Sequence, residues 1–498
     1  MTKYDMRYLL VTAFLLALVP GQGDGKVPTF TEDIAPLVFG SCTKCHRPGE
    51  AGPFSLRTYR DVSKRARNLL SVMEERIMPP WHPKPGYGEF RNELRLSDAQ
   101  IAMFRSWVEA GKPEGPVESL PDLPNFPDGW QLGEPDVIIK MSGAFPIPAD
   151  GRDIYRNFSL PLDLPEDKWM TAMEVRPGDR EVLHHVLLFL DPTKQARASD
   201  GRDGKPGFRG RGLGRSSTMV AGWAVGGQPE HLPEGLGIKL PKGSDLILQS
   251  HFHPTGRRTE EQTTIGLYFA KEEPKRTTVT VQLPPLFGFF AGLDIPAGEA
   301  DFQLQDSFEL PCDVDAVTIG GHAHVLCREM RMYAVLPDDS EVPLMHIPDW
   351  DFDWQNRYTF AQSVPLPKGS VIHAHIRYDN SEGNPDNPNA PPRRVKWGRE
   401  TSDEMGSLTL LVTPKEEGDT RELEQAIRQH LRTSMTGRKP ISVADRFASY
   451  DKNGDEQLSP DEVPQQLRRF FGRLDKNGDG VLSLDEAKVL GALQRRRR

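Results

Sequence analysis

Two cysteines and a histidine lie within five residues near the amino terminus, in the segment Cys42-Thr43-Lys44-Cys45-His46. Two thiols at this spacing could form a disulfide, a redox dithiol or half of a zinc site. The histidine that follows directly favours another interpretation, because two thiols can add to the vinyl groups of one haem while the imidazole ligates its iron. We therefore predict a covalent c-type haem held by Cys42, Cys45 and His46.

A second axial ligand for this iron is expected downstream. Met78 stands just before Pro79 and Pro80, which favour an extended loop over a helix. Met73 is a weaker candidate because it continues the apolar stripe of a predicted helix, which makes it a core residue. His82 is also possible, although a loop histidine is commonly a plain surface residue. Met78 is the predicted ligand.

Histidines concentrate in the middle of the chain, where ten of the thirteen lie between residues 184 and 375. On a strand, residues i and i+2 share a face, so a His-x-His segment can direct two imidazoles at one metal. Adjacent histidines can share an ion only where a bulge distorts the strand. Imidazole-rich sites suit copper or zinc, and an added thioether favours copper. The four pairs are His184-His185, His251-Phe252-His253, His322-Ala323-His324 and His373-Ala374-His375.

A thioether is available in the segment "ETSDEMGSLTLLV", where Met405 precedes a predicted strand. Taken alone, a methionine in this position is more often a core residue than a ligand. An internal repeat adds a complication, because "LPKGS" occurs at 240–244 and at 366–370, each time before a strand that bears His-x-His. From the residues alone, Met405, His373 and His375 remain alternative third ligands for a second metal.

The elements that must position these residues change in type along the chain. Apolar residues first recur at helical spacing, then a proline-rich stretch follows, and then short alternating strands are separated by Pro, Gly and Asp turns. The predicted fold class is multidomain. It comprises a signal peptide (1–25), a small all-α cytochrome c domain (26–112), a linker (113–135), two antiparallel jelly-roll β-sandwiches (136–275 and 276–415), a linker (416–440) and an α-helical EF-hand pair (441–498).

Two segments near the carboxyl terminus, "DKNGDEQLSPDE" and "DKNGDGVLSLDE", carry oxygen ligands at the spacing of calcium loops. Glu456 of the first loop occupies the place of the turn glycine, Gly480, in the second, so the first loop is expected to bind calcium more weakly. The predicted calcium ligands are Asp451, Asn453, Asp455, Gln457, Ser459 and Glu462, and then Asp475, Asn477, Asp479, Val481, Ser483 and Glu486.

The amino terminus has the pattern of a secretory signal, with Lys3 and Arg7 ahead of an apolar run from Tyr8 to Val19. This run is shorter than the ~20 residues that a membrane-spanning helix needs. We predict an exported protein of the periplasm or the extracellular space without a transmembrane segment after signal removal; a retained anchor is the alternative. The balance of 62 basic and 71 acidic residues does not favour a nucleic-acid partner.

Four segments, taken in order, resemble the type II copper, ascorbate-dependent monooxygenases, the family of peptidylglycine hydroxylating and dopamine β-monooxygenases. They are "EVLHHVLLF", "LILQSHFHPTG", "GGHAHVLCREMRMYAV" and "TSDEMGSLTLLV", and the resemblance covers residues 136–415. It implies one copper on each of two sandwiches. The implied ligands are His184, His185 and His251 for an electron-transfer copper and His322, His324 and Met405 for an oxygen-activating copper, with Gln249 matching a glutamine of the family.

The resemblance also implies a reaction, the hydroxylation of a C–H bond in an organic substrate with O2. One oxygen atom would enter the substrate and the other would leave as water, with two electrons from an external donor. We expect the fused haem to deliver them, although a haem with an independent role is the alternative. A rival function is a non-catalytic haem and copper protein for electron transfer or copper handling. Whether His253, His373 and His375 bind metal is left open.

The chain departs from the family in two respects. Most of the family's cysteines are missing, and Cys312 and Cys327 remain, which could pair in an oxidising compartment or stay as thiols. The position at which the peptide-hydroxylating relative binds a substrate carboxylate with an arginine is Gly320 here. Ser407 and Thr409 likewise replace an asparagine and a tyrosine of that relative. Glycine-extended peptides are therefore expected to be poor substrates.

Overall fold

The computed structural model describes residues 26–127, 129–210, 218–437, 447, 450–451, 453, 455–463, 468, 471–484 and 486. The predicted signal peptide lies outside the described residues. Close contacts divide the chain into two units. Unit 1 comprises Met1–Trp81 and Glu93–Pro127, and unit 2 comprises His82–Asn92 and Asp128–Arg498.

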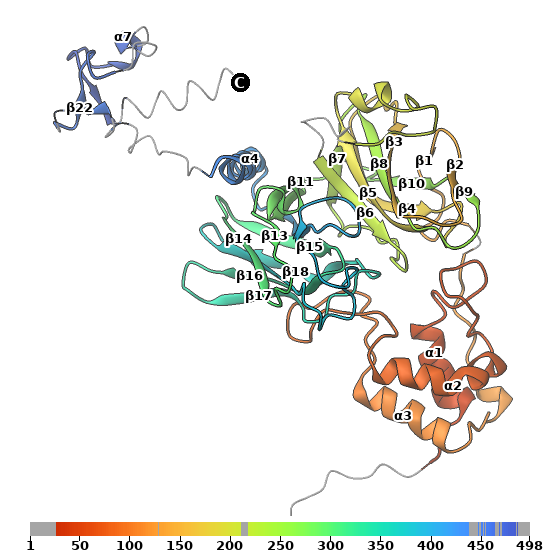
Figure 1. Ribbon diagram of the computed structural model, residues 1–498. Coiled ribbons are helices and arrows are strands. Elements are labelled where there is room, and N and C mark those ends of the chain that lie inside the picture. The colour runs from red at the N-terminus through yellow and green to blue at the C-terminus, as the bar shows by residue number, and fades with distance from the viewer. Residues whose placement is uncertain are drawn as a thin grey trace, which may run out of the picture. The chain divides into compact units, whose positions relative to one another are not determined.

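Three α-helices surround the hydrophobic core of unit 1 (Figure 1). Four apolar positions of the second helix recur every three or four residues and are buried, so this amphipathic pattern produces a packed helix. Ser97 and Gln100 form a capping box that begins the third helix. Met73 is a core residue, as its place on the apolar stripe predicts. The elements are η1 (Phe30–Ile34), α1 (Ala35–Ser41), α2 (Tyr59–Glu74), α3 (Asp98–Glu109) and η2 (Val117–Ser119).

The predicted fold class is wrong. The chain is mostly β, with 33% strand and 18% helix, and neither an all-α cytochrome domain nor an EF-hand helix pair is seen in the described residues. Between the helices of unit 1, residues 42–58, 75–81 and 93–97 form turns and extended segments rather than further helices. At the carboxyl end, the described residues show α7 (Phe471–Leu474) and a short ladder of β22 (Gln457–Leu458) with β23 (Leu482–Ser483).

Two sheets of unit 2 enclose one hydrophobic core and are called the first sheet pair. One has the strand order β1-β10-β4-β7-β11 and the other the order β3-β8-β5-β6. The strands are β1 (Val137–Lys140), β3 (Ile154–Pro161), β4 (Lys168–Arg176), β5 (Leu183–Asp191), β6 (Thr218–Ala224), β7 (Leu236–Leu240), β8 (Asp245–Phe252), β10 (Thr264–Phe269) and β11 (Arg276–Thr277). A smaller sheet pairs β2 (Phe145–Ile147) with β9 (Thr259–Glu261).

Two further sheets, called the second sheet pair, have the orders β12-β21-β15-β18 and β14-β19-β16-β17. Every residue of β21 is buried, whereas β19 alternates between buried and half-buried positions. The strands are β12 (Val279–Leu283), β14 (Phe302–Glu309), β15 (Val314–Ala323), β16 (Cys327–Val335), β17 (Glu341–Ile347), β18 (Arg357–Leu366), β19 (Val371–Tyr378) and β21 (Gly406–Pro414). A smaller sheet pairs β13 (Asp294–Ile295) with β20 (Val395–Lys396).

Residues 82–92 belong to unit 2 although they follow α2 in the chain. Phe90 forms a bridge with Phe360 of β18, and the Arg91 amide donates to the Thr359 carbonyl at 2.8 Å. Because β18 is the last strand of its sheet, this segment covers backbone groups at an edge that would otherwise be open to another chain.

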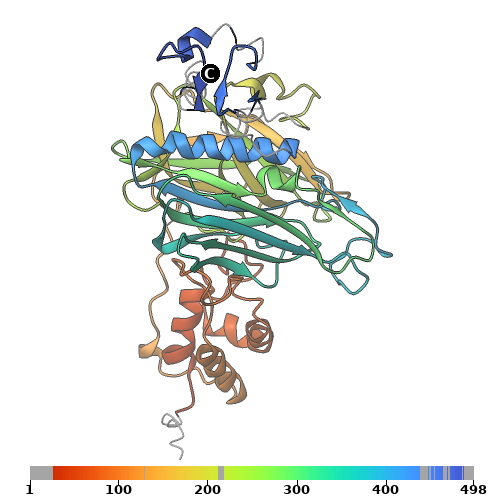
Figure 2. The same ribbon diagram turned by 90° about the vertical axis from the view of Figure 1, so that its left-hand side faces the viewer.

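The segment predicted as a linker at 416–440 contains α4 (Thr420–Thr436), which lies against the second sheet pair (Figure 2). Strong helix formers dominate this sequence, and the side chain of Leu423 is buried. His430 Nε2 lies 2.8 Å from Asp306 Oδ2 of β14. No helix among the described residues is long and apolar enough to cross a membrane.

The predicted disulfide between Cys312 and Cys327 is not formed, and both residues are buried free thiols. Cys327 pairs with Tyr378 at one end of β19, whereas Cys312 follows Glu309, which pairs with Val371 at the other end. The eight-residue strand between these ends spans roughly 25 Å. A disulfide needs Cα atoms within about 7 Å, so the two cysteines cannot bond in this fold.

Candidate metal centre

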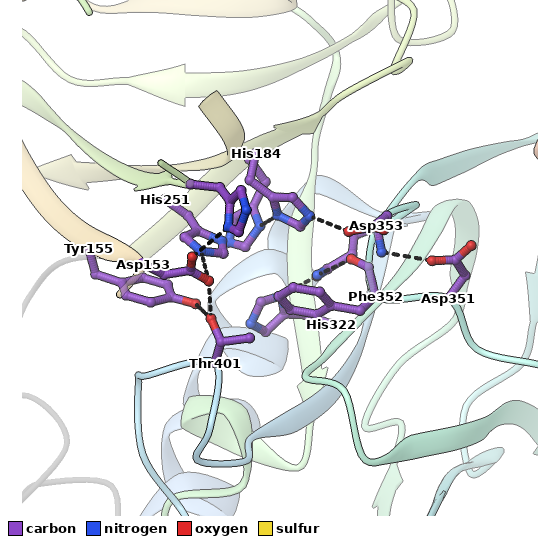
Figure 3. A network of polar contacts seen from close by, with 12 residues as sticks. Asp153, Tyr155, His184, His251, His322, Asp351, Phe352, Asp353 and Thr401 are labelled. Atoms are coloured by element: carbon purple, nitrogen blue, oxygen red, sulfur yellow. Dashed lines mark hydrogen bonds and ion pairs between the residues drawn. The ribbon is translucent and has the colours of Figure 1, made fainter. Parts of the chain in front are cut away.

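Three histidines of the first sheet pair converge at the end of two neighbouring strands and form the first ligand group. Figure 3 shows two of them, His184 and His251. His184 and His185 lie on β5, and His251 lies on β8. The pairing of β5 with β8 shifts register between Leu183 and His185, and this irregularity lets two adjacent histidines share a site. One ligand atom of each histidine lies within 4.8 Å of the others, so the group could hold a metal ion.

Carboxylates outside the first ligand group decide which imidazole nitrogens face inward. His251 Nε2 lies 2.9 Å from Asp153 Oδ2, and His184 Nε2 lies 3.1 Å from Asp353 Oδ1. Each contact places the N–H on the outer nitrogen and leaves the Nδ1 lone pair for a metal. Among the described residues, His251 Nδ1 is buried without a hydrogen-bond partner. A buried acceptor left open beside two other imidazoles fits a bound cation.

Asp153 connects the first ligand group to a loop of the second sheet pair. Its other oxygen, Oδ1, lies 2.7 Å from Nδ1 of the exposed His253, whereas the Thr401 hydroxyl donates to Oδ2, the oxygen that also contacts His251. Although burial acts in the opposite direction, these contacts and His251 hold the pKa of the Asp153 carboxyl well below its usual range. Asp153 is therefore a carboxylate, and His253 is an outer partner of it rather than a member of the inward group.

Two histidines and a methionine of the second sheet pair form the second ligand group. His322 lies on β15, His324 follows that strand, and Met405 precedes β21. His322 Nε2 lies 3.1 Å from Met405 Sδ. The structure therefore brings Met405, and not His373 or His375, to the pair of histidines on β15. All three side chains of the group are buried.

Neutral oxygen atoms hold the imidazoles of the second ligand group. His322 Nδ1 contacts Gln355 Oε1, and His324 Nδ1 lies 3.0 Å from the Asp403 carbonyl oxygen. These contacts leave Nε2 of both rings as the inward nitrogen. Within the described residues, His324 Nε2 is buried without a hydrogen-bond partner. Two open Nε2 atoms and a thioether make a donor set that fits copper.

Glu404 ties together the two segments that carry the second ligand group. Its buried carboxyl group accepts hydrogen bonds from the backbone N–H groups of His324 at 3.0 Å, Leu326 at 2.8 Å and Met405 at 3.0 Å. Burial raises the pKa of Glu404 to about 8, although the N–H donors oppose this shift. The residue stands inside the motif that identified Met405, but the sequence did not indicate its positioning role.

The two ligand groups lie side by side within unit 2. The ring centroids of His185 and His322 are 5.4 Å apart. Phe352 stacks on His184 at 4.8 Å, and its ring lies 6.0 Å from those of His251 and His324. A cavity beside them is lined by residues of both groups. A ligand in this cavity would meet both groups at once.

Burial keeps the imidazoles of His185, His251, His322 and His324 neutral near neutral pH. It lowers the pKa of His251 and of His322 to about 4 and that of His324 to about 3, and the neighbouring imidazoles add to this effect. The pKa of His185 is lowered well below its usual value for the same reasons. Neutral imidazole is the form that ligates metals, so no proton has to be displaced from these rings at neutral pH.

Three residues considered from the sequence lie apart from these groups. The Gln249 side-chain N–H donates a hydrogen bond to Asn157 Oδ1 at 3.0 Å, so its amide nitrogen is engaged by another side chain. His373 and His375 share one side of β19, where the ring of Tyr333 lies 5.0 and 5.6 Å from theirs. The alternation of β19 directs both histidines away from the buried positions of that strand, which explains why they form a separate cluster.

The haem-binding residues predicted in unit 1 lie at the end of α1 and in the turn that follows. His46 Nδ1 lies 3.1 Å from the Phe54 carbonyl oxygen, which leaves Nε2 as the nitrogen for an iron ligand. A Cβ atom added to Gly52 would lie 2.7 Å from His46 Nδ1, so only a glycine lets the backbone at position 52 lie this close to the His46 ring. Burial raises the pKa of the Cys42 thiol to about 12, so Cys42 is protonated unless it is alkylated.

The candidates for the second iron ligand fall in different units. Met78 follows α2 in unit 1, and its amide donates to the Val72 carbonyl at 3.0 Å. His82 belongs to unit 2, where its Nε2 is buried and, among the described residues, has no hydrogen-bond partner. The assignment of Met78 remains a prediction.

The described residues of the two predicted calcium loops make matching hydrogen bonds. Asp451 Oδ2 accepts the Glu456 amide at 2.9 Å, and Asp475 Oδ2 accepts the Gly480 amide at 3.0 Å. The final glutamate of each loop accepts hydrogen bonds from a serine three residues before it. Glu456 has φ +61°, a left-handed conformation that costs a non-glycine residue roughly 1–2 kcal/mol. Calcium binding itself remains a prediction.

Comparisons with known proteins do not identify a family. No family model and no curated protein matches the chain. PNGF-II matches with a TM-score of 0.27 and 10% identity over 56% of this chain and 66% of its own. A peptide-N(4)-(N-acetyl-β-D-glucosaminyl) asparagine amidase has a TM-score of 0.23 and 12% identity, over 56% of this chain and 96% of its own. The VP2 subviral particle of infectious bursal disease virus matches with a TM-score of 0.18 and 7% identity, over 59% of this chain and 74% of its own. These weak likenesses carry no argument about fold or function.

Proposed function

We propose that this chain is an exported, copper-dependent monooxygenase that hydroxylates a C–H bond of an organic substrate with O2. One observation carries the proposal: a group of three imidazoles, of which His184 is half-buried, and a buried group of two imidazoles and a thioether lie side by side next to one cavity. Imidazoles alone would suit zinc as well, but the sulfur of Met405 favours copper.

Copper bound at both groups would supply one-electron redox chemistry and the activation of O2. The chain's own part in the reaction follows from its contacts. Asp153 and Asp353 orient the rings of the first ligand group, and Gln355 and the Asp403 carbonyl orient those of the second. Burial of the second group keeps bulk water from the reacting atoms, which prevents side reactions of a reactive oxidant.

A covalent haem on Cys42, Cys45 and His46 would provide electrons to this centre in the proposed scheme. Each hydroxylation consumes two electrons beyond those of the C–H bond, and a haem carries one at a time. A haem fused to the oxygenase has a high effective concentration there, which favours its service as the donor. Two calcium ions in the carboxyl-terminal loops would complete the cofactor set, and their role would be structural.

The proposal is tested with full-length, copper-loaded protein and a panel of C–H substrates. Oxygen consumption and incorporation of ¹⁸O from ¹⁸O2 into the product are measured together. Met405→Ala is expected to abolish product formation while the first ligand group retains its copper. Met435→Ala is the matched control, because Met435 is 52% exposed on α4.

The outcomes separate the two candidate functions. Oxygen consumption with ¹⁸O-labelled product that depends on Met405 supports the monooxygenase. Full copper and haem content, reversible reduction and no oxygen consumption with any substrate would instead indicate an electron-transfer or copper-handling protein.

A further inference from the structure

An arginine that forms no ion pair with any of the described residues lines the cavity beside the two ligand groups. Arg357 begins β18, and the cavity that it lines is also bounded by His185 and His322. Arg357 is exposed to solvent although protein atoms crowd around it, and it contributes to the lining of the cavity. A molecule bound in the cavity could therefore reach this side chain.

The guanidinium group of Arg357 makes few polar contacts with the described residues. It donates one hydrogen bond, from Nη2 to Thr318 Oγ1 at 3.3 Å, and among the described residues no carboxylate forms an ion pair with it. Other arginines of unit 2 do have such partners, as Arg156 has in Asp203 and Arg276 in Asp315. The guanidinium stays protonated in proteins. A ligand that brings a negative charge would supply the ion-pair partner that the described residues do not provide.

A glycine on the neighbouring strand makes room for this side chain. Gly320 of β15 pairs with Arg357 of β18, and a Cβ atom added to Gly320 would lie 3.2 Å from Arg357 Cγ. A larger residue at position 320 would therefore press on the arginine. His322 lies two residues further along β15, on the same side of the strand as Gly320. The Arg357 side chain therefore lies beside the second ligand group.

The opposite wall of the cavity is largely apolar. It comes from β5 and β6 of the first sheet pair, with Val186, Leu187, Met219 and Trp223. The indole N–H of Trp223 donates to the Gly227 carbonyl at 3.2 Å, so this ring offers the cavity an apolar face and no spare donor. The lining thus suits a molecule with an apolar body and one anionic end.

We propose that Arg357 binds the carboxylate of the substrate and that the substrate class is a small monocarboxylic acid with an apolar or aromatic body. This inference rests on the proposed function and names the substrate of that same site. The planar guanidinium matches a carboxylate with two parallel hydrogen bonds, which orients the bound acid as well as holding it. Contact between the acid's body and the apolar wall then presents a C–H bond to the second ligand group.

Binding is measured first without turnover, by calorimetry on full-length, copper-loaded, oxidised protein with no reductant. The probes are benzoate and its uncharged counterpart benzamide. Arg357→Gln is expected to weaken benzoate binding about tenfold to a hundredfold, because a charge-assisted contact is lost, and to leave benzamide unchanged. Arg357→Lys should retain part of the affinity. Arg394→Gln is the control, because Arg394 lies on the surface and pairs with Asp294.

A second variant tests the same contact with the charge retained. Gly320→Ala should displace the arginine and weaken benzoate binding while the protein keeps its copper, which also covers the case in which Arg357→Gln fails to fold. Equal binding of benzoate and benzamide by the unmodified protein, or benzoate binding that neither variant changes, would overturn the inference.

Turnover then separates this inference from the proposed function. If carboxylic acids are hydroxylated and Arg357→Gln raises KM more than it lowers kcat, both are supported. If they are hydroxylated with an unchanged KM in that variant, the inference fails and the monooxygenase stands. If benzoate binding depends on Arg357 but no acid is ever oxidised, the anion site stands and the proposed function fails.

Discussion

The two ligand groups hold their imidazoles in opposite ways. In the first group, His184 and His251 direct Nδ1 inward and give Nε2 to the carboxylates Asp353 and Asp153. In the second group, His322 and His324 direct Nε2 inward and give Nδ1 to neutral oxygens, the Gln355 amide and a backbone carbonyl. The second group also contains the sulfur of Met405, and the first contains a third imidazole.

This difference assigns the groups distinct electrostatic character. If copper is bound, the carboxylates behind the first group would make its imidazoles more basic and favour the higher charge of oxidised copper. The neutral oxygens and the thioether of the second group would favour cuprous copper. The proposed division, in which the first group passes electrons and the second performs the oxidation, builds on this contrast.

The largest expected effect is on copper binding, and it distinguishes His251, whose Nδ1 faces inward, from the nearby His253, which lies outside the group. His251→Ala should weaken copper binding at the first group by more than about a hundredfold, because one of three ligands and its carboxylate contact are lost. His253→Ala is the control, since His253 contacts the same Asp153 from outside. Copper content after dialysis and the spectrum of the cupric protein report the result. Equal copper loss in both variants would mean that His253 is also a ligand.

The next largest effect is expected when the residues that hydrogen-bond the outer imidazole nitrogens, Asp353 and Gln355, are substituted. Asp353→Asn should weaken cupric binding at the first group by about ten- to a hundredfold, whereas Gln355→Glu should strengthen cupric over cuprous binding at the second. Competition titrations with chelators of known affinity for each oxidation state measure both. If the two substitutions shift the oxidation-state preference in the same direction, the electrostatic distinction between the groups is wrong.

A smaller and local effect is expected at Glu404. Glu404→Gln places an amide where three backbone N–H groups need acceptors, which should lower the free energy of unfolding by about 1–3 kcal/mol. Copper should be lost from the second group in preference to the first. Denaturant unfolding and copper content are the measurements. A stable variant with both coppers in place would show that the Glu404 contacts do not position His324 and Met405.

The smallest effect is expected on β19. The double variant His373→Ala, His375→Ala should leave copper content and turnover unchanged and alter stability by less than about 1 kcal/mol, because both histidines lie on the half-buried side of the strand. Loss of the second copper in this variant would transfer a ligand role from Met405 to these histidines.

Local sequence patterns identified the residues of both groups but not their surroundings. The i, i+2 spacing of His322 and His324 is enough to place two imidazoles on one side of a strand, and two adjacent histidines imply the irregularity found on β5. The choice between Met405 and His373 depended on which strands are neighbours. The outer partners Asp153, Asp353 and Gln355 come from segments distant in the sequence, so no spacing indicates them.

The wrong predictions, a disulfide and a set of helical domains, also arose because local patterns do not show which strands are neighbours. Cys312 and Cys327 are fifteen residues apart in the sequence, but strand pairing puts them at opposite ends of β19. The expectation that glycine-extended peptides are poor substrates, which rests on Gly320, stays a prediction; strand pairing places Arg357 opposite that glycine, which no local pattern indicates. The helices expected to define separate domains are few, and strands dominate the chain.

Residue types and short spacings by themselves determined where this chain carries imidazole and thioether groups, a Cys-x-x-Cys-His segment and oxygen-rich loops, from which the copper, haem and calcium sites are proposed. The tertiary structure decided which of those residues meet, which nitrogen of each ring faces inward and which cation stands in the cavity. The physical reason is that a strand's periodicity sets the side on which a residue lies, whereas hydrogen bonding between strands distant in sequence sets its neighbours.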